Sequence, residues 1–402
     1  MRKMYNKWAQ VGRDCEEGVN IERLRRERLQ RTREAMRSHG LGAMVVFTGY
    51  NVRYITGTVG APFPNERYAV LPLEGEPMLF ELGGDLRWIR DFAAPWLAGR
   101  ISYSIPFGHA LQFGREPAAK MLKMFVGDIK KALEANGVSR EKVGFDFLSH
   151  AVAGALEDAN INYVEGVTCM DDARYVKTKD ELQCLAIAAS IADACFYTME
   201  QMLKPGVREW EVWAEMNKTA ISLGAESIIG SFASGGRTNP YCRFTISDRI
   251  LAPGDLVIAD VVLPYMGYYA DFVRTMLVGD KPTSEQKALY RECYDSLQKA
   301  MNAVKAGVGT DKVAEALPYG TFEDFSLNIA HGVGLNIHER PFTTHMFSKD
   351  YPIELKPNCY MAIETYVAKP GGADGVRLEE DFVVTETGYK TFSRYPFDER
   401  ML

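Results

Sequence analysis

Residues 257–275 read VIADVVLPYMGYYADFVRT, and this stretch decides how the second half of the chain folds. Asp260 and Asp271 each interrupt an apolar, β-prone run that has the composition of a buried strand. A buried carboxylate costs several kcal/mol unless it is protonated, paired or bound to a metal ion. The two aspartates therefore indicate a site that supplies a proton or a cation.

The residues between the two runs, Pro264-Tyr-Met-Gly267, have the composition of a turn. A symmetric four-residue hairpin loop at this point predicts that Asp260 lies directly opposite Asp271. Directly opposed side chains have Cβ atoms roughly 4.5–5.5 Å apart, and like charges at that separation repel. We therefore expect a cation between these two carboxylates.

A second hairpin is predicted in residues 361–384, MAIETYVAKPGGADGVRLEEDFVV. A turn at Pro370-Gly-Gly-Ala373 places Glu364 opposite Glu379, so a second pair of acids is opposed. Between the hairpins lies HGVGLNIHERP (331–341), whose His331 offers the neutral imidazole that many metal sites use. Four carboxylates and one imidazole predict a site for one or two divalent ions such as Mn, Fe, Co or Zn. The alternative is a set of buried, hydrogen-bonded acids and a core histidine, and two opposed acidic pairs argue against it.

These five residues, in this order, resemble the ligand set of the creatinase/aminopeptidase P/prolidase/methionine aminopeptidase superfamily. The metal ligands that the resemblance implies are Asp260, Asp271, His331, Glu364 and Glu379. The flanking words that agree with the superfamily are Gly254–Asp260, Tyr268–Asp271 with Arg274-Thr275, His331–Leu335 and Val376–Glu379. The resemblance implies an α/β (α+β) protein with a pita-bread catalytic domain that holds two divalent ions. It also implies an N-terminal creatinase-like α/β domain, which carries Asn51-Val-Arg-Tyr-Ile-Thr-Gly57.

The first part of the chain alternates between strand-like and helical patterns, which predicts a small α/β layer. The predicted strands are 43–47, 67–73, 77–81 and 143–147, and the predicted helices are 23–38, 85–96, 117–136 and 151–160. A capping box, Thr178-Lys-Asp-Glu181, then opens a long helix that continues to about residue 202. We therefore predict a creatinase-like domain over residues 1–172 and a pita-bread catalytic domain over residues 173–402.

Three features bear on which branch of the superfamily the chain resembles. Peptidases of the family usually have a histidine before the first aspartate, where this chain reads SGGRTNPYCR (234–243). Arg237-Thr-Asn-Pro240 and the ending Tyr395-Pro-Phe-Asp398 resemble the dimethylsulfoniopropionate lyase branch, which performs a β-elimination. However, the chain has Val262 and His338 at the two positions where that lyase carries additional aspartates. A histidine at position 338 resembles the hydrolases.

The favoured prediction is metal-dependent hydrolysis of an amide-type bond, as in an Xaa-Pro peptidase, in a small peptide-like or zwitterionic substrate. Metal-activated water attacks, Glu364 takes its proton, and His338 stabilises the developing oxyanion. The predicted substrate-binding residues are Arg340, Arg377 and Tyr241, of which the arginines could grip a substrate carboxylate. One alternative is a metal-dependent C–S lyase that acts on dimethylsulfoniopropionate or a related zwitterion. Another is a non-catalytic binding module, which the complete ligand set disfavours.

The composition of the chain limits the classes of partner and the cellular compartment that we expect. The net charge of −6 gives no basic field that would favour nucleic acid or anionic lipid. No apolar stretch approaches the roughly 20 residues of a membrane-spanning helix, and residues 1–20 lack the apolar core of a signal peptide. The seven cysteines form no C-x-x-C pair and indicate reduced thiols. We expect a cytoplasmic enzyme with a small-molecule or short-peptide substrate, and the resemblance implies a homodimer.

Overall fold

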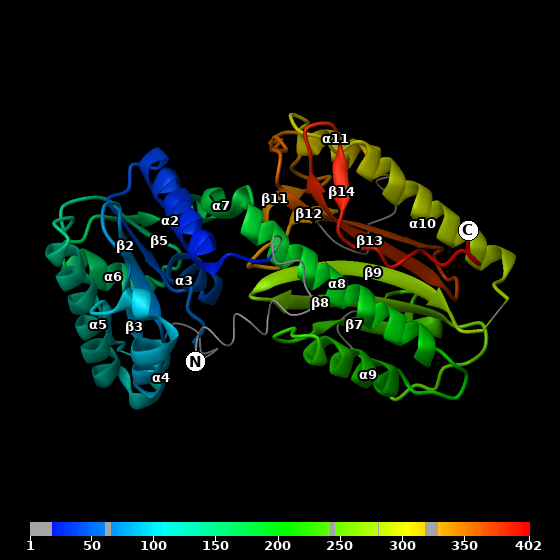
Figure 1. Ribbon diagram of the computed structural model, residues 1–402, viewed down its shortest axis with the longest axis horizontal. Coiled ribbons are helices and arrows are strands. Elements are labelled where there is room, and N and C mark those ends of the chain that lie inside the picture. Colours follow the sequence, from blue (N-terminus) through cyan, green and yellow to red (C-terminus); the bar gives the residue numbers. More distant parts are fainter. Residues whose placement is uncertain (1–17, 61–65, 106, 242–245, 280, 318–328) are drawn as a thin grey trace. The chain divides into compact units, whose positions relative to one another are not determined.

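A computed structural model describes residues 18–60, 66–105, 107–241, 246–279, 281–317 and 329–402 of the chain (Figure 1). The chain divides into two compact units, one spanning Asn20–Arg174 and the other containing Tyr175–Leu402. Both units combine helices with sheets, so the predicted α/β (α+β) class is confirmed.

The N-terminal unit is built on a six-stranded mixed sheet in the order β4-β3-β2-β1-β5-β6. Its strands are β1 (Ala43–Val46), β2 (Tyr68–Pro72), β3 (Met78–Glu81), β4 (Ile101–Tyr103), β5 (Val143–Phe145) and β6 (Tyr163–Glu165). The central strand β1 pairs antiparallel with β2 and parallel with β5, and all four of its residues are buried. Both faces of β1 are therefore covered, which explains its continuous apolar run.

Six α-helices accompany this sheet among the described residues. They are α2 (Ile21–Ser38), α3 (Gly49–Thr56), α4 (Gly83–Trp88), α5 (Arg115–Ala135), α6 (His150–Asp158) and α7 (Val167–Tyr175). The single helix predicted over residues 85–96 is wrong, because α4 passes into a π-helical turn (Ile89–Ala93) and a short 3-10 helix (Pro95–Leu97). Proline has no N–H to donate and disfavours the α conformation in the residue before it, so Pro95 ends the helix.

One buried carboxylate holds the start of α3, a helix that the sequence patterns did not predict. Asp146 accepts hydrogen bonds from the Phe47 amide (2.7 Å), the Thr48 hydroxyl (2.6 Å) and the Asn51 side-chain amide (2.8 Å). A negative charge at a helix N-terminus is favourable because the unpaired amides there carry partial positive charge. The hydrogen bond to Asp146 thus explains why an asparagine stands at position 51, the first residue of the segment Asn51–Gly57.

The second unit contains a three-stranded sheet, β7-β8-β9, and a five-stranded sheet, β11-β10-β12-β13-β14. The strands are β7 (Ile229–Ser234), β8 (Leu256–Tyr265), β9 (Tyr268–Leu277), β10 (Ala330–Gly332), β11 (Glu339–Thr343), β12 (Tyr360–Ala368), β13 (Gly375–Val384) and β14 (Tyr389–Thr391). The helices are α8 (Lys179–Met202), α9 (Glu209–Ser222), α10 (Ser284–Asn302) and α11 (Thr310–Ala316). In Figure 1, α8 runs along β9 and α10 runs along β13.

Helices α8 and α9 cover one face of the three-stranded sheet. The predicted capping box opens α8, where the Thr178 side chain and the Glu181 side chain each accept a backbone N–H of the other residue. Phe196 of α8 packs on Phe272 of β9, with ring centroids 5.1 Å apart. By length and composition alone α8 could cross a membrane, so the prediction that no stretch approaches that length is wrong. Half of its most apolar window is buried, as in a core helix.

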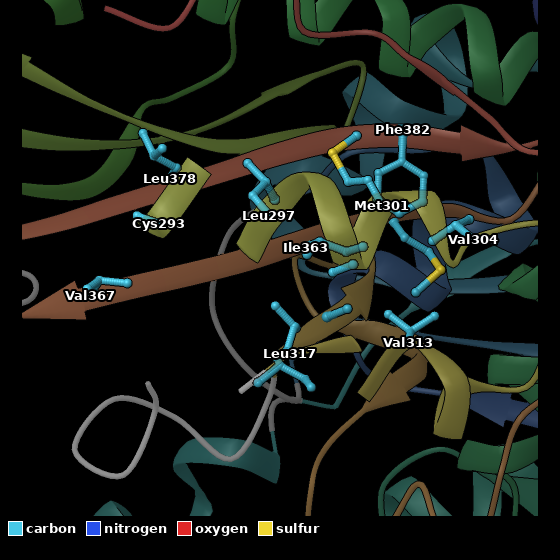
Figure 2. Close-up of a cluster of buried hydrophobic side chains, with 14 of the residues drawn as sticks. Cys293, Leu297, Met301, Val304, Val313, Leu317, Ile363, Val367, Leu378 and Phe382 are labelled. Atoms are coloured by element: carbon cyan, nitrogen blue, oxygen red, sulfur yellow. The ribbon is translucent and has the colours of Figure 1, made fainter. Parts of the chain in front are cut away.

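Helices α10 and α11 cover the outer face of the five-stranded sheet. Figure 2 shows Leu297 and Met301 of α10 among side chains of β12 and β13, including Ile363 and Phe382. Burying an apolar side chain of this size contributes about 1.5–3 kcal/mol, so this layer anchors both strands. Successive side chains of a strand point to opposite faces, so β13 directs Leu378 into this core and Glu379 away from it.

The inner faces of the two hairpins meet in the middle of the second unit. Ile258 of β8, Val273 of β9 and Tyr366 of β12 form one buried cluster. Asp260 and Asp271 lie two residues from Ile258 and Val273, on the same faces of their strands. The acidic residues of both hairpins therefore face the same interior space.

Candidate metal centre

The first hairpin turns one residue later than the four-residue loop predicts, which shifts every pairing partner by two residues. Its turn is Met266-Gly267, and both residues have positive φ angles, 51° and 81°, as a two-residue type I′ turn requires. Asp260 therefore lies opposite Val273, and Asp271 lies opposite Val262. The prediction that the two aspartates are directly opposed is wrong, because Met266 adopts a conformation uncommon outside glycine. A shift of two residues preserves the face, so both carboxylates still point inward.

The second hairpin has the predicted register. Glu364 of β12 lies directly opposite Glu379 of β13. On the other side of β12, His331 of β10 pairs with Ala362, which brings its imidazole beside Glu364. The Nε2 atom of His331 lies 3.3 Å from Glu364 Oε1 and 3.8 Å from Asp271 Oδ2. His331 thus lies between an acid of each hairpin.

All five predicted ligands converge, and all five are buried. Asp260, Asp271 and Glu379 each offer a carboxylate oxygen within 4.8 Å of the others. His331 and Glu364 form a second group with Glu379 under the same limit. Glu379 belongs to both groups, so it could bridge two ions.

Several of these donor atoms are buried without a hydrogen-bond partner among the described residues. They are Asp260 Oδ1, His331 Nε2, Glu379 Oε1 and Glu379 Oε2. Each unsatisfied buried polar group costs about 1–3 kcal/mol, so such a cluster needs a ligand. The Nδ1 atom of His331 lies 3.1 Å from the Gly332 carbonyl, to which it can donate, leaving Nε2 with a free lone pair. Carboxylate oxygens and a neutral imidazole suit a divalent transition metal, and the residues fit that ion.

Arg377 is the cation that the structure places inside this cluster. Its guanidinium lies 2.5 Å from Asp260 Oδ2 and 3.2 Å from Glu379 Oε2, and it also pairs with Glu364. Burial opposes its charge, but the carboxylates of Asp260, Glu379 and Glu364 raise the pKa of Arg377 well above its ordinary value. Arg377 therefore stays charged and offsets part of the cluster's negative charge.

The two glutamates respond differently to this environment. Burial disfavours the charged form of Glu364, but Arg377 and His331 outweigh it and lower the pKa of Glu364. Burial raises the pKa of Glu379 well above its ordinary value, and the nearby charges of Asp271 and Glu364 raise it further. The cluster is thus strained electrostatically, and a bound divalent cation would relieve that strain.

Side-chain hydrogen bonds join the two acidic hairpins to each other. The Asp271 amide donates to Asp381 Oδ2 at 2.8 Å. The Thr275 hydroxyl donates to the Arg377 carbonyl at 2.6 Å and accepts the Arg377 amide at 3.0 Å. We call these residues, Asp271, Thr275, Arg377 and Asp381, the hairpin seam. It sets the separation between the acids of β9 and those of β13.

The sequence patterns assigned no role to Thr275 or Asp381. Asp381 lies two residues after Glu379, so strand alternation alone places it on the same inward face. Burial raises the pKa of Asp381 well above its ordinary value, and the charge of Asp271 adds to this effect. The sequence did contain a signal for Asp381. It is a third inward-facing acid of the second hairpin, after Glu364 and Glu379, at an alternating position of a buried strand.

His338 is the exposed member of the cluster. Its ring lies edge-on to that of His331, with centroids 4.2 Å apart, and it offers a nitrogen within 4.8 Å of donor atoms of Asp271 and His331. The five predicted metal ligands are buried, whereas His338 can contact a molecule arriving from solvent.

The remaining predicted substrate-binding residues have different surroundings. Tyr241 is half-buried beside the cluster, with the Arg377 guanidinium 5.8 Å from its ring centroid. The ring of Tyr241 also stacks on Tyr366 at 6.2 Å. Arg340 instead lies over the ring of Tyr175 at 5.6 Å. The structure thus brings Tyr241 and Arg377 together and places Arg340 against a different side chain.

Comparison with known proteins assigns both parts of the chain. Residues 183–386 match metallopeptidase family M24, and residues 28–176 match the creatinase/prolidase N-terminal domain. The chain belongs to metallopeptidase family M24. This confirms the predicted creatinase/aminopeptidase P/prolidase superfamily, with its creatinase-like N-terminal domain and pita-bread catalytic domain. As a member of this family, the protein is an M24 metallopeptidase-family enzyme, and its acidic and histidine clusters could bind divalent metal ions.

Three curated relatives and one solved structure illustrate the similarity. The uncharacterized peptidase YqhT of Bacillus subtilis is 26% identical over 384 residues, covering 92% of this chain and 98% of the relative. The Xaa-Pro dipeptidase of Pyrococcus furiosus is 31% identical over 231 residues, covering 56% of this chain and 64% of the relative. Dimethylsulfoniopropionate lyase DddP of Roseovarius nubinhibens is 23% identical over 421 residues, covering 99% of this chain and 91% of the relative. The Xaa-Pro dipeptidase structure from Bacillus anthracis shares the fold, with a TM-score of 0.74 and 24% identity over 94% of this chain and 99% of that one.

Proposed function

We propose that this protein hydrolyses an amide bond in a small peptide-like substrate, in the manner of an Xaa-Pro dipeptidase. The observation that carries the proposal is the convergence of five buried acidic and imidazole groups that could hold metal, with one exposed histidine, His338, beside them. The similarity to the Xaa-Pro dipeptidase of Pyrococcus furiosus supports the same class of substrate. Two divalent ions of the Mn, Fe, Co or Zn type suit the donor set, and Asp260, Asp271, His331, Glu364 and Glu379 would hold them.

Bound divalent ions supply a water molecule whose pKa is lowered toward neutrality. Glu364 contributes a carboxylate within the cluster that would accept the proton of this water. His338 lies at the exposed edge of the cluster, where an imidazole N–H can donate to the oxyanion that develops on the substrate carbonyl. Tyr241 contributes an aromatic wall beside Arg377. These roles divide proton transfer, charge stabilisation and substrate contact among three different side chains.

The test is a hydrolysis assay with the full chain loaded separately with Mn²⁺, Fe²⁺, Co²⁺ or Zn²⁺. Xaa-Pro dipeptides are the probes, with matched Xaa-Ala dipeptides as the comparison, and free proline is the expected product. A protein that binds metal and retains its fold, yet releases no amino acid from any of these peptides, would overturn the peptidase proposal.

A second candidate is a metal-dependent C–S lyase, which the similarity to lyase DddP over nearly the whole chain favours. The Arg237-Thr-Asn-Pro240 word that resembles the lyase has a structural role here, because Arg237 pairs with the buried Glu209 and with Ser247. Dimethylsulfoniopropionate is the probe for this candidate. A lyase yields an alkene and a sulfide, whereas a hydrolase adds water to its products.

The proposal also covers assembly and location. We propose a cytoplasmic homodimer, with no nucleic-acid or membrane partner, in which the N-terminal unit contributes to dimer formation. Sedimentation of the full chain at micromolar concentration tests the proposed dimer. A monomer with full activity would contradict it.

A further inference from the structure

A buried ion pair lies next to His338 but outside the metal cluster. Lys177 Nζ is 2.6 Å from Glu339 Oε1, and the two side chains are only 1% and 2% exposed. Glu339 directly follows His338 and begins β11, and Lys177 directly precedes Thr178, which caps α8. The pair therefore joins the start of a core helix to the loop that carries the exposed histidine.

Two glycines of the sequence word HGVGLNIHERP make room for this arrangement. A Cβ atom at Gly334 would lie 2.2 Å from Glu339 Oε1, closer than any real contact. A Cβ atom at Gly332 would lie 2.3 Å from the Arg340 carbonyl oxygen. Glycine at both positions thus allows the Glu339 carboxylate to fold back under the loop toward Lys177.

The two ends of the pair are held by backbone hydrogen bonds. The Lys177 amide donates to the Asn358 carbonyl at 2.9 Å. On the loop side, Gly334 accepts the Tyr269 amide at 2.9 Å, and Val333 donates to Tyr360 at 3.0 Å. With both ends fixed, the ion pair fixes the Glu339 side chain inward. Because Glu339 directly follows His338, fixing the Glu339 side chain also restricts the backbone that carries the exposed His338.

Stability alone does not account for the pair. Burying two charges costs several kcal/mol of desolvation, and well-packed apolar residues of similar volume are often at least as stabilising. Glu339 is also kept out of the metal cluster, although it lies next to His338 and carries a carboxylate. A lysine that draws this acid away from the cluster leaves His338 as the exposed group at its edge.

We propose that Lys177 and Glu339 are positioning residues for His338, needed for turnover and not for metal binding. This inference rests on the proposed function, in which His338 acts on the substrate. The expected effect of breaking the pair is a fall in kcat on the order of 10²-fold, the scale of misplacing a catalytic group by about 1 Å. The metal affinity should stay the same, because neither side chain belongs to the cluster.

The experiment compares Lys177→Met, Glu339→Gln and the double variant in the full chain. Each single variant leaves one buried charge without its partner and is expected to be less stable than the wild type. The double variant removes both charges and is expected to regain stability. All three are expected to lose kcat with little change in KM, and to bind Co²⁺ with unchanged affinity and an unchanged visible spectrum. Recovery of stability without recovery of kcat separates positioning from folding.

A matched control is available in the N-terminal unit. Arg67 and Glu81 form another buried pair, 2.8 Å apart, with 6% and 0% exposure. Arg67→Met is expected to lower stability comparably while leaving kcat unchanged. Unchanged kcat in Lys177→Met or Glu339→Gln would overturn the proposal, as would a fall in kcat that follows lost Co²⁺ affinity.

A readout that does not need activity keeps this test separate from that of the proposed function. The ring resonances of His338 can be identified in a histidine-labelled sample by their loss in His338→Ala. They are expected to move in the Lys177 and Glu339 variants and to stay in place in Arg67→Met. Unmoved resonances would overturn the positioning role even if the wild-type protein hydrolysed no peptide. Moved resonances with an inactive wild type would instead locate the failure in the proposed function.

Discussion

Glu379 is a single residue whose position lowers the stability of the metal-free protein. It is completely buried, faces Glu364 across the hairpin, and both of its oxygens lack a hydrogen-bond partner among the described residues. Arg377 is the neighbouring side chain that favours its charged form. A residue in this position destabilises the metal-free protein and gains its favourable interactions when a divalent cation binds.

Replacing single acids of the cluster is therefore expected to abolish metal binding without unfolding the protein. Asp271→Ala and Glu379→Ala should each lose bound metal and activity. Their metal-free forms should be at least as stable as the metal-free wild type, because each substitution removes a like-charge repulsion. Metal content per chain and urea unfolding of the metal-free proteins measure this. Full activity in either variant would contradict the proposed metal site.

His338 provides the residue-scale test between hydrolase and lyase. His338→Ala is expected to lower kcat for hydrolysis by a factor on the order of 10²–10³, the usual scale for losing one oxyanion donor. His338→Asp should be at least as damaging, because it places a negative charge where the oxyanion forms. Metal content, measured in parallel, should stay intact. Robust activity in His338→Asp would instead favour an elimination in which a carboxylate serves as the base.

At the scale of elements, the metal site depends on how two hairpins are joined. Each hairpin supplies two acids, and β9 and β13 belong to different sheets. The hairpin seam connects them through side-chain bonds to the backbone, including the paired bonds between Thr275 and Arg377. These bonds fix the spacing of the acids without relying on a shared β-ladder.

Thr275→Val tests the seam with a substitution that keeps the side-chain shape. It leaves the buried Arg377 amide and carbonyl without their partner, so we expect a loss of about 2 kcal/mol in the free energy of unfolding. Metal affinity should fall roughly tenfold, as it does when groups supporting a metal ligand are removed. Thr365→Val is the control, because the Thr365 hydroxyl also donates to a buried carbonyl, that of Leu378, but on the outer face. Equal metal affinity in both variants would show that the seam does not set the site.

In the N-terminal unit, Asp146 controls the start of α3. Asp146→Asn replaces an accepting oxygen by a donating amide that faces N–H or O–H donors. We expect a loss of about 2 kcal/mol, since one or more buried donors would lose their acceptor. Urea unfolding of the full chain measures the loss, and unchanged stability at every pH would contradict the capping role.

The same substitution carries a pH dependence of known sign. Burial raises the pKa of Asp146, although hydrogen bonds from Thr48 and Asn51 oppose the effect. The folded state therefore holds this proton more tightly than the unfolded state does. The resulting stabilisation is fully present below about pH 4 and is lost as the pH rises through the raised pKa. The advantage of the wild type over Asp146→Asn should accordingly be largest at low pH and shrink as the pH rises.

At the scale of the whole molecule, the five proposed metal ligands all lie in one of the two units. Binding to the folded state should therefore stabilise the unit that contains Tyr175–Leu402, by about 2.7 kcal/mol when free metal is 100 times its Kd. Hydrogen exchange with and without Mn²⁺ measures this strand by strand. Exchange should slow in β8, β9, β12 and β13 and remain unchanged in β1, β2 and β5. Equal slowing in both units would contradict a site confined to the second unit.

The sequence by itself determined the local features of this protein. The capping box at Thr178 follows from side-chain chemistry within one helical turn. The pairing of Glu364 with Glu379 follows from a turn whose glycines and proline centre the hairpin. The sequence also pointed to four acids and His331 as candidate metal ligands, because acids in buried strands need a proton, a partner or a cation.

Only the tertiary structure decided how distant residues meet. The left-handed backbone of Met266 shortens the first hairpin loop, and no local signal at a methionine announces that conformation. Arg377 was predicted from the sequence to bind a substrate carboxylate, and the packing of two sheets encloses it among three carboxylates of the protein. Lys177 and Glu339 are 162 positions apart, and their contact exists because a helix start and a strand start are packed together. Such contacts depend on the arrangement of layers, which side-chain pattern along one segment does not encode.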